Sequence, residues 1–269
     1  MSTKPPADDA RPAPHTKAPL LRSAVLSLHG VVHGFTSREG GVSTGPLASL
    51  NLAPRPGESV DTLHENWCRV TRALRPDLAP EAVAVMHQVH GDRVVRVVGA
   101  RGPFDPAGEA DGAVTTELGV VLAVRTADCV PVLLAAPGGV AVAHAGWRGV
   151  VAGVVPAVVA ALCDAAGAGP AQVAAAIGPH ISGEAYEVGE EVVVGMRATG
   201  LPDAVFLLPR PGRRDHVDLG AAVWAQLERA GVLHIERVPG CTASDPRFYS
   251  HRRDGPETGR MAGVVARLP

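Results

Sequence analysis

The sequence predicts a single α/β domain on the strength of three observations. The chain has 269 residues, 46% hydrophobic and 19% charged, which is long for one domain but short for two and enough to bury a large core. Runs of β-branched residues are interspersed with stretches whose apolar residues recur at helical spacing. Aromatic residues make up only 3%, so we expect a core of small aliphatic side chains packed closely between sheets and helices.

The first 22 residues are predicted to be a disordered tail, and the domain is expected to cover residues 23–269. The tail is rich in Pro, Ala and charge and lacks the apolar segment of a signal peptide. The longest apolar run, Val150 to Cys163, would span only about 20 Å as a helix, less than a bilayer core of roughly 30 Å. We therefore expect no membrane span.

Charge and cysteine content exclude several partners. The net charge is −2, from 25 basic and 27 acidic side chains, so there is no overall electrostatic case for binding nucleic acid or an anionic membrane. The four cysteines are widely spaced, without a C-x-x-C pair or a dense disulfide pattern. This usage favours a reducing cytoplasm. The oligomeric state is not predicted.

The N-terminal third predicts a strand, a loop, a helix and two more strands. Residues 25–35 alternate loosely and suggest a strand or hairpin, followed by a Gly/Ser/Thr-rich loop. Arg38 in this loop could contact an anion, or the loop could be an ordinary surface turn. Residues 59–74 predict a helix with one apolar face, and residues 81–98 predict two strands around His87 to Asp92. The residues of that helical face are Val60, Leu63, Trp67, Val70 and Leu74.

The middle of the chain, from Val120 to Gly149, reads as strand, turn and strand. VVLAVRTADC is continued by VPVLLA, and PGG turns the chain into VAVAHAG. Cys129 and His144 therefore lie on neighbouring segments. The run that follows, up to Ala166, predicts a buried helix in which Pro156 marks either a kink or the start of the regular part.

The last third predicts a buried strand, a Gly-Pro turn and a helix entered near Val188. An amphipathic helix follows, with Asp218 as its N-cap and Gly231 as its stop. A short polar region before the final apolar strand then carries Arg247, Arg252, Arg253 and Arg260. Four arginines beside Ser, Thr and Gly suit a phosphate or other oxyanion through bidentate contacts, although a solvated basic loop has the same composition.

Three residues carry the most reactive chemistry: His90, Cys129 and His144. Two imidazoles and a thiolate can bind Zn²⁺ and leave one position open, in which case bound water acquires a pKa of about 7. Alternatively, Cys129 is a nucleophile with a histidine as its base. Their spacing is long and not that of a compact zinc motif, so the residues alone favour a third interpretation, a buried cysteine with two unrelated histidines.

The sequence resembles a bacterial family known as laccase-domain or polyphenol oxidase proteins, also called peptidoglycan editing factors and purine nucleoside phosphorylases. The matching segments occur in family order and cover nearly the whole chain from about His33 onwards. They are HGFTSREGGVSTGPLASLNL, QVHGDRV, ADGAVTT, TADCVPVLL, AHAGWRG, AAIGPHISGEAYEVG, DLGAAV, and CT with FYSHRRDG and TGRMAG.

The resemblance implies a mixed β-sandwich flanked by helices, in a four-layer α/β arrangement. It also implies a catalytic metal site, with His90, Cys129 and His144 as ligands of Zn²⁺, or alternatively of copper. The implied activity is phosphorolysis of adenosine, inosine and methylthioadenosine with deamination of adenosine in the same site, so purine nucleosides and phosphate are the expected partners.

Further roles are assigned as hypotheses on this basis. Arginines that would hold phosphate are Arg38, Arg148, and Arg252 or Arg253. Asp128 is a possible base, and His180 and Tyr186 could line the pocket. Two other classes stay open. One is a hydrolase, either a Cys/His hydrolase without metal or a cytoplasmic enzyme that edits mis-built UDP-muramoyl peptide precursors. The other is a non-enzymatic cell-division partner.

Overall fold

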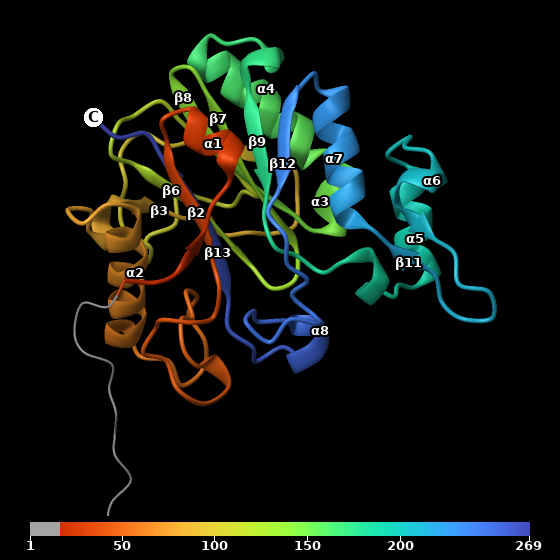
Figure 1. Ribbon diagram of the computed structural model, residues 1–269, viewed down its shortest axis with the longest axis horizontal. Coiled ribbons are helices and arrows are strands. Elements are labelled where there is room, and N and C mark those ends of the chain that lie inside the picture. Colours follow the sequence, from red (N-terminus) through yellow and green to blue (C-terminus); the bar gives the residue numbers. More distant parts are fainter. Residues whose placement is uncertain (1–16) are drawn as a thin grey trace, which may run out of the picture.

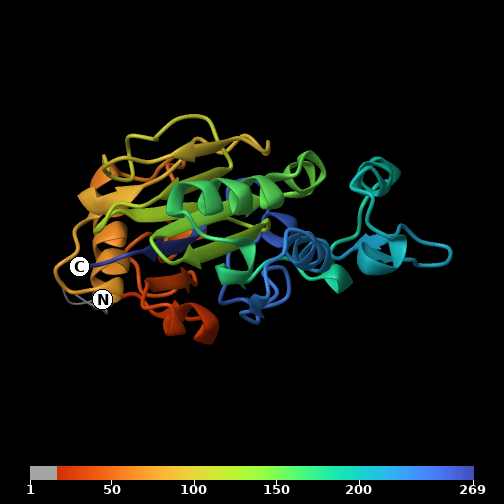
Figure 2. The same cartoon turned by 90° about the horizontal axis from the view of Figure 1, so that it is seen from above.

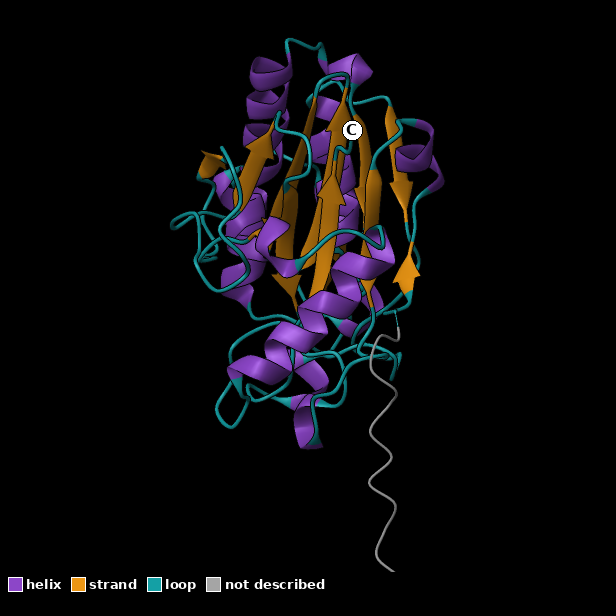
Figure 3. Ribbon diagram, turned by 90° about the vertical axis from the view of Figure 1, so that its left-hand side faces the viewer, coloured by secondary structure: helices purple, strands orange, loops and turns teal. Residues whose placement is uncertain are grey.

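Two β-sheets lie face to face, and helices cover both outer faces (Figure 1; Figure 3). The structure is a computed structural model and describes residues 17–269. The five-stranded sheet has the order β1-β2-β13-β6-β3, and the six-stranded sheet has the order β12-β9-β7-β8-β5-β4. Both sheets are mixed, because β3 is parallel to β6, β4 to β5, and β12 to β9, whereas the other pairs are antiparallel.

The elements of the two sheets are distributed along the whole chain. The five-stranded sheet consists of β1 (Leu20–Leu21), β2 (Val32–Thr36), β13 (Met261–Ala266), β6 (Val121–Thr126) and β3 (Val83–Ala84). The six-stranded sheet consists of β12 (His234–Arg237), β9 (Ala174–Ile177), β7 (Val130–Ala136), β8 (Gly139–Ala145), β5 (Gly112–Thr115) and β4 (Val94–Arg96). A separate pair is formed by β10 (Leu207–Leu208) and β11 (His216–Val217).

Eight α-helices accompany these strands in the described part of the chain. They are α1 (Ala24–Leu28), α2 (Val60–Leu74), α3 (Trp147–Ala152), α4 (Val154–Ala166), α5 (Glu190–Arg197), α6 (Asp203–Phe206), α7 (Leu219–Arg229) and α8 (His251–Asp254). Helices α5 and α6 extend from one end of the sandwich (Figure 1; Figure 2). Within residues 17–269 no helix combines the length and the apolar character needed to cross a membrane.

Side chains on successive positions of β7 point into different layers. Leu133 packs between the two sheets, whereas Leu134 packs under α4 and α7 on the outer face of the six-stranded sheet. This follows from the two-residue period of a strand, and burial on both faces explains why the run is apolar throughout. On the other side of the sandwich, Trp67 and Val70 of α2 pack against Val264 of β13. The four-layer arrangement is therefore confirmed.

The predicted helices begin and end close to where the sequence places them. Ser59 accepts a hydrogen bond from the backbone N–H of Thr62 and caps α2, and Asp218 caps α7 in the same way. Gly153, with φ of +94°, separates α3 from α4, and Pro156 stands in the first turn of α4. A proline there removes an N–H that the helix leaves unpaired anyway, so the regular helix starts near Pro156 and is not kinked by it.

Three expectations need correction. Residues 24–28 form α1 and not a strand, because Ser23 caps a helical turn before β2 begins. The segment from residue 121 to 136 is not one continuous run, since β6 and β7 belong to opposite sheets and the chain crosses between them at residues 127–129. Leu20–Leu21, assigned to the tail, pair with β2 as β1. The rest of the predicted tail, residues 1–16, lies outside the described residues.

Candidate metal centre and its cavity

The fold brings His90, Cys129 and His144 together at one end of the sandwich. His90 lies in the loop between β3 and β4, Cys129 immediately precedes β7, and His144 is near the end of β8. Pro131 is paired with His144 in the β7–β8 register, and Val130 is paired with Ala145 at the end of this ladder. Cys129 therefore lies just beyond the end of the ladder, close to His144. The ligand atoms of the three side chains all lie within 4.8 Å of one another.

Asp111, which the sequence did not single out, holds two of these residues in place. Its carboxylate accepts hydrogen bonds from the backbone N–H groups of Val89, His90 and Gly91 at 2.8–3.1 Å. The same carboxylate contacts Nδ1 of His144 at 2.7 Å. With Nδ1 donating to Asp111, Nε2 of His144 is left as the ligand atom, the arrangement typical of metal-binding histidines.

The loop that carries His90 is fixed in an unusual backbone conformation. His90 has φ of +63°, a region that residues other than glycine seldom adopt unless the surroundings impose it. Besides the Asp111 contacts, the side chain of Gln88 pairs with the backbone N–H and C=O of Arg125 on β6, both at 2.8 Å. The loop is thus fastened to both sheets, which aims the His90 ring at Cys129.

Gly146 leaves the room that the three side chains occupy. A Cβ at this position would lie 2.8 Å from Cδ2 of His90 and 3.0 Å from Sγ of Cys129. Both separations are shorter than ordinary van der Waals contact, so a side chain here would push the cluster apart. The glycine before Trp147 in HAGWRG therefore has a packing reason at the site itself.

The cluster favours a thiolate beside a charged imidazole. Burial opposes the charged form of Cys129, but the neighbouring His144 and hydrogen bonds from both imidazoles lower its pKa to about 6. Burial likewise opposes protonation of His144, yet the Cys129 thiolate and Asp111 raise the pKa of His144 to about 9. The cluster therefore offers a deprotonated sulfur, and a metal cation that bound here would displace the proton from Nε2 of His144.

The donor set fits a single transition-metal ion. Sγ of Cys129 and Nε2 of His90 are 3.8 Å apart, close to the separation of roughly 3.6 Å that a tetrahedral zinc imposes on a sulfur and a nitrogen ligand. Three protein ligands leave one position of such an ion open. His144 is buried, Cys129 is half-buried and His90 is exposed, so the open position would face the solvent side of the cluster.

That side is a cavity of about 710 Å³. Its volume falls within the range of small-molecule sites. The cavity runs from the cluster past the start of α2 to the loop before β5, and its walls are partly apolar and partly basic. The lining residues that matter here are His90, Cys129, His144, Phe104, Arg55, Arg125 and Arg260.

The basic wall consists of three arginines that the sequence did not predict as a group. Arg260 belongs to the polar region near the C-terminus whose four arginines suit a phosphate or other oxyanion, whereas no anion-binding role was predicted for Arg55 and Arg125. Arg125 did carry a signal, because it is the one charged residue in the otherwise apolar strand β6. Arg55, between two prolines in an ordinary loop sequence, had none.

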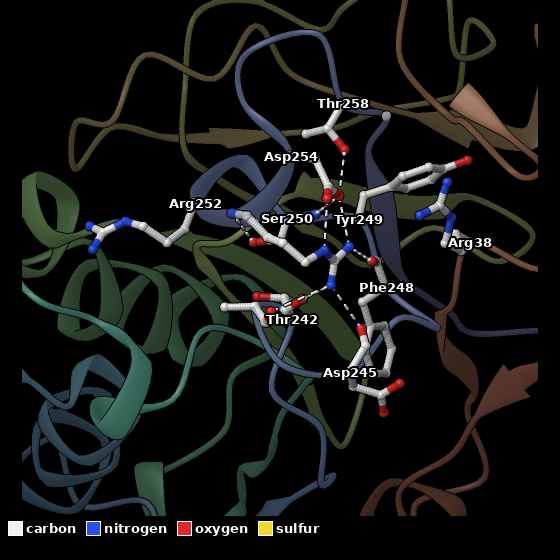
Figure 4. Close-up of polar contacts among 12 residues, drawn as sticks. Arg38, Thr242, Asp245, Phe248, Tyr249, Ser250, Arg252, Asp254 and Thr258 are labelled. Atoms are coloured by element: carbon white, nitrogen blue, oxygen red, sulfur yellow. Dashed lines mark hydrogen bonds and ion pairs between the residues drawn. The ribbon is translucent and has the colours of Figure 1, made fainter. Parts of the chain in front are cut away.

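The four arginines to which phosphate binding was assigned on the basis of the family resemblance do not line this cavity; they are Arg38, Arg148, Arg252 and Arg253. Arg253 is engaged within its own loop region: its guanidinium donates to both carboxylate oxygens of Asp254 at 2.7 Å and to the carbonyls of Thr242 and Phe248 at 3.0 and 2.7 Å. Figure 4 shows this network, with Arg252 and Arg38 extending on opposite sides of it.

The other three are stacked on aromatic rings. The guanidinium of Arg38 lies 4.7 Å from the ring centre of Tyr249 and donates to the carbonyl of Ala48. Arg252 lies over Tyr186 and donates to the carbonyl of Glu187, and Arg148 lies over Trp147. Such contacts hold a guanidinium in place but leave part of its donors available. A phosphate-binding role for these arginines stays a prediction.

The remaining predicted residues have local structural partners. The carboxylate of Asp128 accepts hydrogen bonds from Thr242 Oγ1 at 2.6 Å and from the backbone N–H of Arg252 at 2.8 Å, so it joins the β6–β7 crossing to α8. His180 contacts the carbonyl of Gly178 through Nδ1, and burial lowers its pKa. Burial raises the pKa of Tyr186 to about 12. None of the three lines the cavity.

Comparisons with known proteins identify relatives over most of the chain. The model of a family described as multi-copper polyphenol oxidoreductase laccase matches residues 32–268. The chain is 44% identical over 249 residues to a Deinococcus radiodurans protein named purine nucleoside phosphorylase, covering 92% of each chain. It is 42% identical over 244 residues to a Streptomyces coelicolor protein of the same name, covering 89% of this chain and 96% of the relative.

Solved structures share the fold. The crystal structure of YlmD from Geobacillus stearothermophilus matches with a TM-score of 0.82 and 34% identity, covering 89% of this chain and 93% of that one. The hypothetical protein YfiH of Bacillus licheniformis matches with a TM-score of 0.82 and 30% identity, covering 88% of this chain and 92% of the other.

Proposed function

This chain belongs to the multi-copper polyphenol oxidoreductase laccase family, and we propose that it is a zinc-dependent purine nucleoside phosphorylase. The observation that carries the proposal is the cluster of His90, Cys129 and His144 in the wall of a cavity large enough for a nucleoside and phosphate. Two relatives that are more than 40% identical carry the name of this activity.

In the proposed reaction a phosphate oxygen forms a bond to C1′ of the ribose while the bond from C1′ to the purine nitrogen breaks. The electron pair leaves on the purine, which takes a proton from phosphate or water. When bound by the cluster, a zinc ion supplies Lewis acidity towards the purine base. Asp111 orients His144, and Gly146 leaves room for the side chains of His90 and Cys129, so the purine base meets a site that is already assembled.

The proposed substrates are adenosine, inosine and methylthioadenosine, with deamination of adenosine as a second reaction of the same site. These finer assignments rest on the family resemblance. The four cysteines are all free, which agrees with an enzyme of a reducing cytoplasm.

The family's oxidase description fits the donor set less well. Among the described residues, His90, Cys129 and His144 are the one group of three or more histidine, cysteine or acidic side chains placed to hold a metal. A blue-copper site with a trinuclear centre needs many more histidines than this group offers. Copper could replace zinc at the same ligands, because a His₂Cys set binds Cu²⁺ tightly.

Product analysis tests the proposal. Inosine and adenosine are incubated with the purified protein, with and without inorganic phosphate, and the products are separated by chromatography. We expect ribose 1-phosphate and free purine only when phosphate is present, and inosine from adenosine in either case. Release of ribose without phosphate, or no reaction with any nucleoside, would contradict a phosphorylase.

One observation supports a second candidate, a hydrolase in which Cys129 is the nucleophile. The pKa of Cys129 is lowered to about 6 beside a histidine, which is how cysteine nucleophiles are activated. Metal analysis separates the two candidates. The phosphorylase requires about one zinc per chain and loses its phosphorolytic activity on chelation. Hydrolytic activity that is fully kept after chelation supports the metal-free hydrolase.

A further inference from the structure

We propose that Arg55, Arg125 and Arg260 form the subsite that binds inorganic phosphate. The identity of the anion rests on the proposed phosphorylase function, but the anion site itself follows from three guanidinium groups that line one cavity together with the His/Cys cluster. Guanidinium groups suit phosphate because their donors match pairs of its oxygens. The three come from the loop before α2, from β6 and from the segment before β13.

Within residues 17–269 none of these three arginines forms a close ion pair with a carboxylate. Like charges that are gathered in a partly buried site repel one another. A bound dianion would remove this repulsion and gain three charge-assisted contacts.

Arg55 provides the most direct evidence for an anion site. Its Nε is buried and has no hydrogen-bond partner among residues 17–269, although buried polar groups are paired in the great majority of cases. The residue lies between Pro54 and Pro56, which restrict the backbone on both sides. Because Arg55 lines the cavity, an oxyanion bound there would supply acceptors to its guanidinium.

The electrostatics of the other two arginines agree with a site for an anion. Burial first, and then the charge of Arg55, lowers the pKa of Arg125. The same two causes lower the pKa of Arg260 to about 10. Both groups stay protonated at neutral pH, so the cavity keeps its positive charge for an anion.

Arg260 connects the anion site to the metal centre. Two carbonyls, of Thr258 and Gly259, accept from its Nη1 at 2.9 Å and fix the guanidinium. Arg260 also lines the same cavity as the three residues of the metal centre. A phosphate held here would face a purine held at the cluster, with the ribose between them, as attack at C1′ requires.

The test uses Arg55→Gln, because the buried Nε of Arg55 has no hydrogen-bond partner among the described residues that the change would remove. Arg197→Gln is the matched control: it removes an exposed guanidinium that is paired with Asp203 and lies outside the cavity. Thermal unfolding is measured for the full chain with increasing inorganic phosphate at constant ionic strength, and the KM for phosphate and for inosine is measured in phosphorolysis.

We expect phosphate to raise the melting temperature of the wild type and of Arg197→Gln but not of Arg55→Gln. The KM for phosphate should rise about tenfold or more in Arg55→Gln, as expected for loss of a charge-assisted contact, with the KM for inosine changed less than twofold. Unchanged phosphate binding and KM in Arg55→Gln would overturn the inference, whether or not phosphorolysis occurs.

Two further outcomes separate this inference from the proposed function. If the wild type shows no phosphorolysis but phosphate stabilises it through Arg55, the subsite stands and the phosphorylase fails. If adenosine 5′-monophosphate binds through Arg55 and inorganic phosphate neither binds nor competes with it, the arginines serve a nucleotide phosphate and the inference is wrong.

Discussion

Two groups of arginines in this protein differ in what surrounds their charges. Arg253, in the C-terminal polar region, is enclosed by Asp254 and backbone carbonyls, and its hydrogen bonds with Asp254 raise its pKa. Arg260, in the cavity, donates to two backbone carbonyls but forms no ion pair within residues 17–269, and burial together with Arg55 lowers its pKa. An arginine whose charge is paired stabilises the fold, whereas one whose charge is unpaired is available to an anionic ligand.

The comparison shows why residue type and spacing did not identify the anion site. Arg252 and Arg253 stand in a segment rich in Ser, Thr and Gly, which looks like a phosphate loop, yet Arg253 is consumed by its own neighbours. Arg55 stands in an ordinary loop sequence and Arg125 in a strand, and the two residues come to line one cavity only through tertiary structure. Availability of the donors therefore decides which arginines can bind an anion.

The largest effect is expected for Cys129→Ala, which tests whether catalysis in the cavity depends on the metal centre. Removing the thiolate should remove the zinc and lower kcat/KM for inosine on the order of 10³-fold, because a metal contributes several kcal/mol of transition-state stabilisation. Zinc content is measured with the kinetics. Cys163→Ala, on α4 and outside the cavity, should keep both zinc and activity.

If Cys129→Ala keeps its zinc and its activity, the donor set is wrong. If it loses zinc but remains fully active, phosphorolysis does not require the metal centre, and of the two ends of the cavity only the three arginines would contribute to the reaction.

A smaller effect is expected for Asp111→Asn. The Asp111 carboxylate contacts the metal ligands His90 and His144, and it forms no ion pair with the cavity arginines in the described chain. An amide has one accepting oxygen where the carboxylate uses two for Val89, His90, Gly91 and His144. We expect zinc affinity to fall about 10- to 100-fold, as for other residues that orient metal ligands. Competition with a chelator of known affinity measures it.

Phosphate-dependent stabilisation supplies the control for Asp111→Asn. It should match the wild type, since the three cavity arginines are untouched. Loss of phosphate binding together with zinc would show that the two ends of the cavity are not separate sites.

The sequence predicts those parts of this arrangement that depend on local pattern. The apolar periodicity of α2 and α7 and their caps at Ser59 and Asp218 are local properties, so their positions are confirmed. The crossing between sheets at residues 127–129 is not local: β6 and β7 are both apolar because both are buried on two faces, and nothing in the pattern separates them.

The candidate site follows the same division. Spacing alone favoured three unrelated residues, and only the family resemblance grouped His90, Cys129 and His144. Asp111 stands in the matched word ADGAVTT, but its role depends on contacts with a loop about twenty residues away and with β8. Such partners are chosen by the fold, so a single sequence does not identify them.

The smallest effect is expected for Arg253→Gln, which tests whether an arginine of the C-terminal polar region contributes to stability and not to phosphate binding. Arg253→Gln removes hydrogen bonds to Asp254, Thr242 and Phe248. Because the side chain is 30% exposed, we expect a loss of only about 1–2 kcal/mol in the free energy of unfolding, a fall of several degrees in melting temperature. The KM for phosphate should stay unchanged.

Arg247→Gln is the matched control in the same region, because Arg247 is exposed and paired only with Asp245. Its effect on the free energy of unfolding should stay within about 0.5 kcal/mol, as for most surface ion pairs. Thermal and urea unfolding of both variants measure the difference. A rise in the KM for phosphate in Arg253→Gln without loss of stability would reverse the assignment, because the satisfied arginine would then be the one that binds the anion.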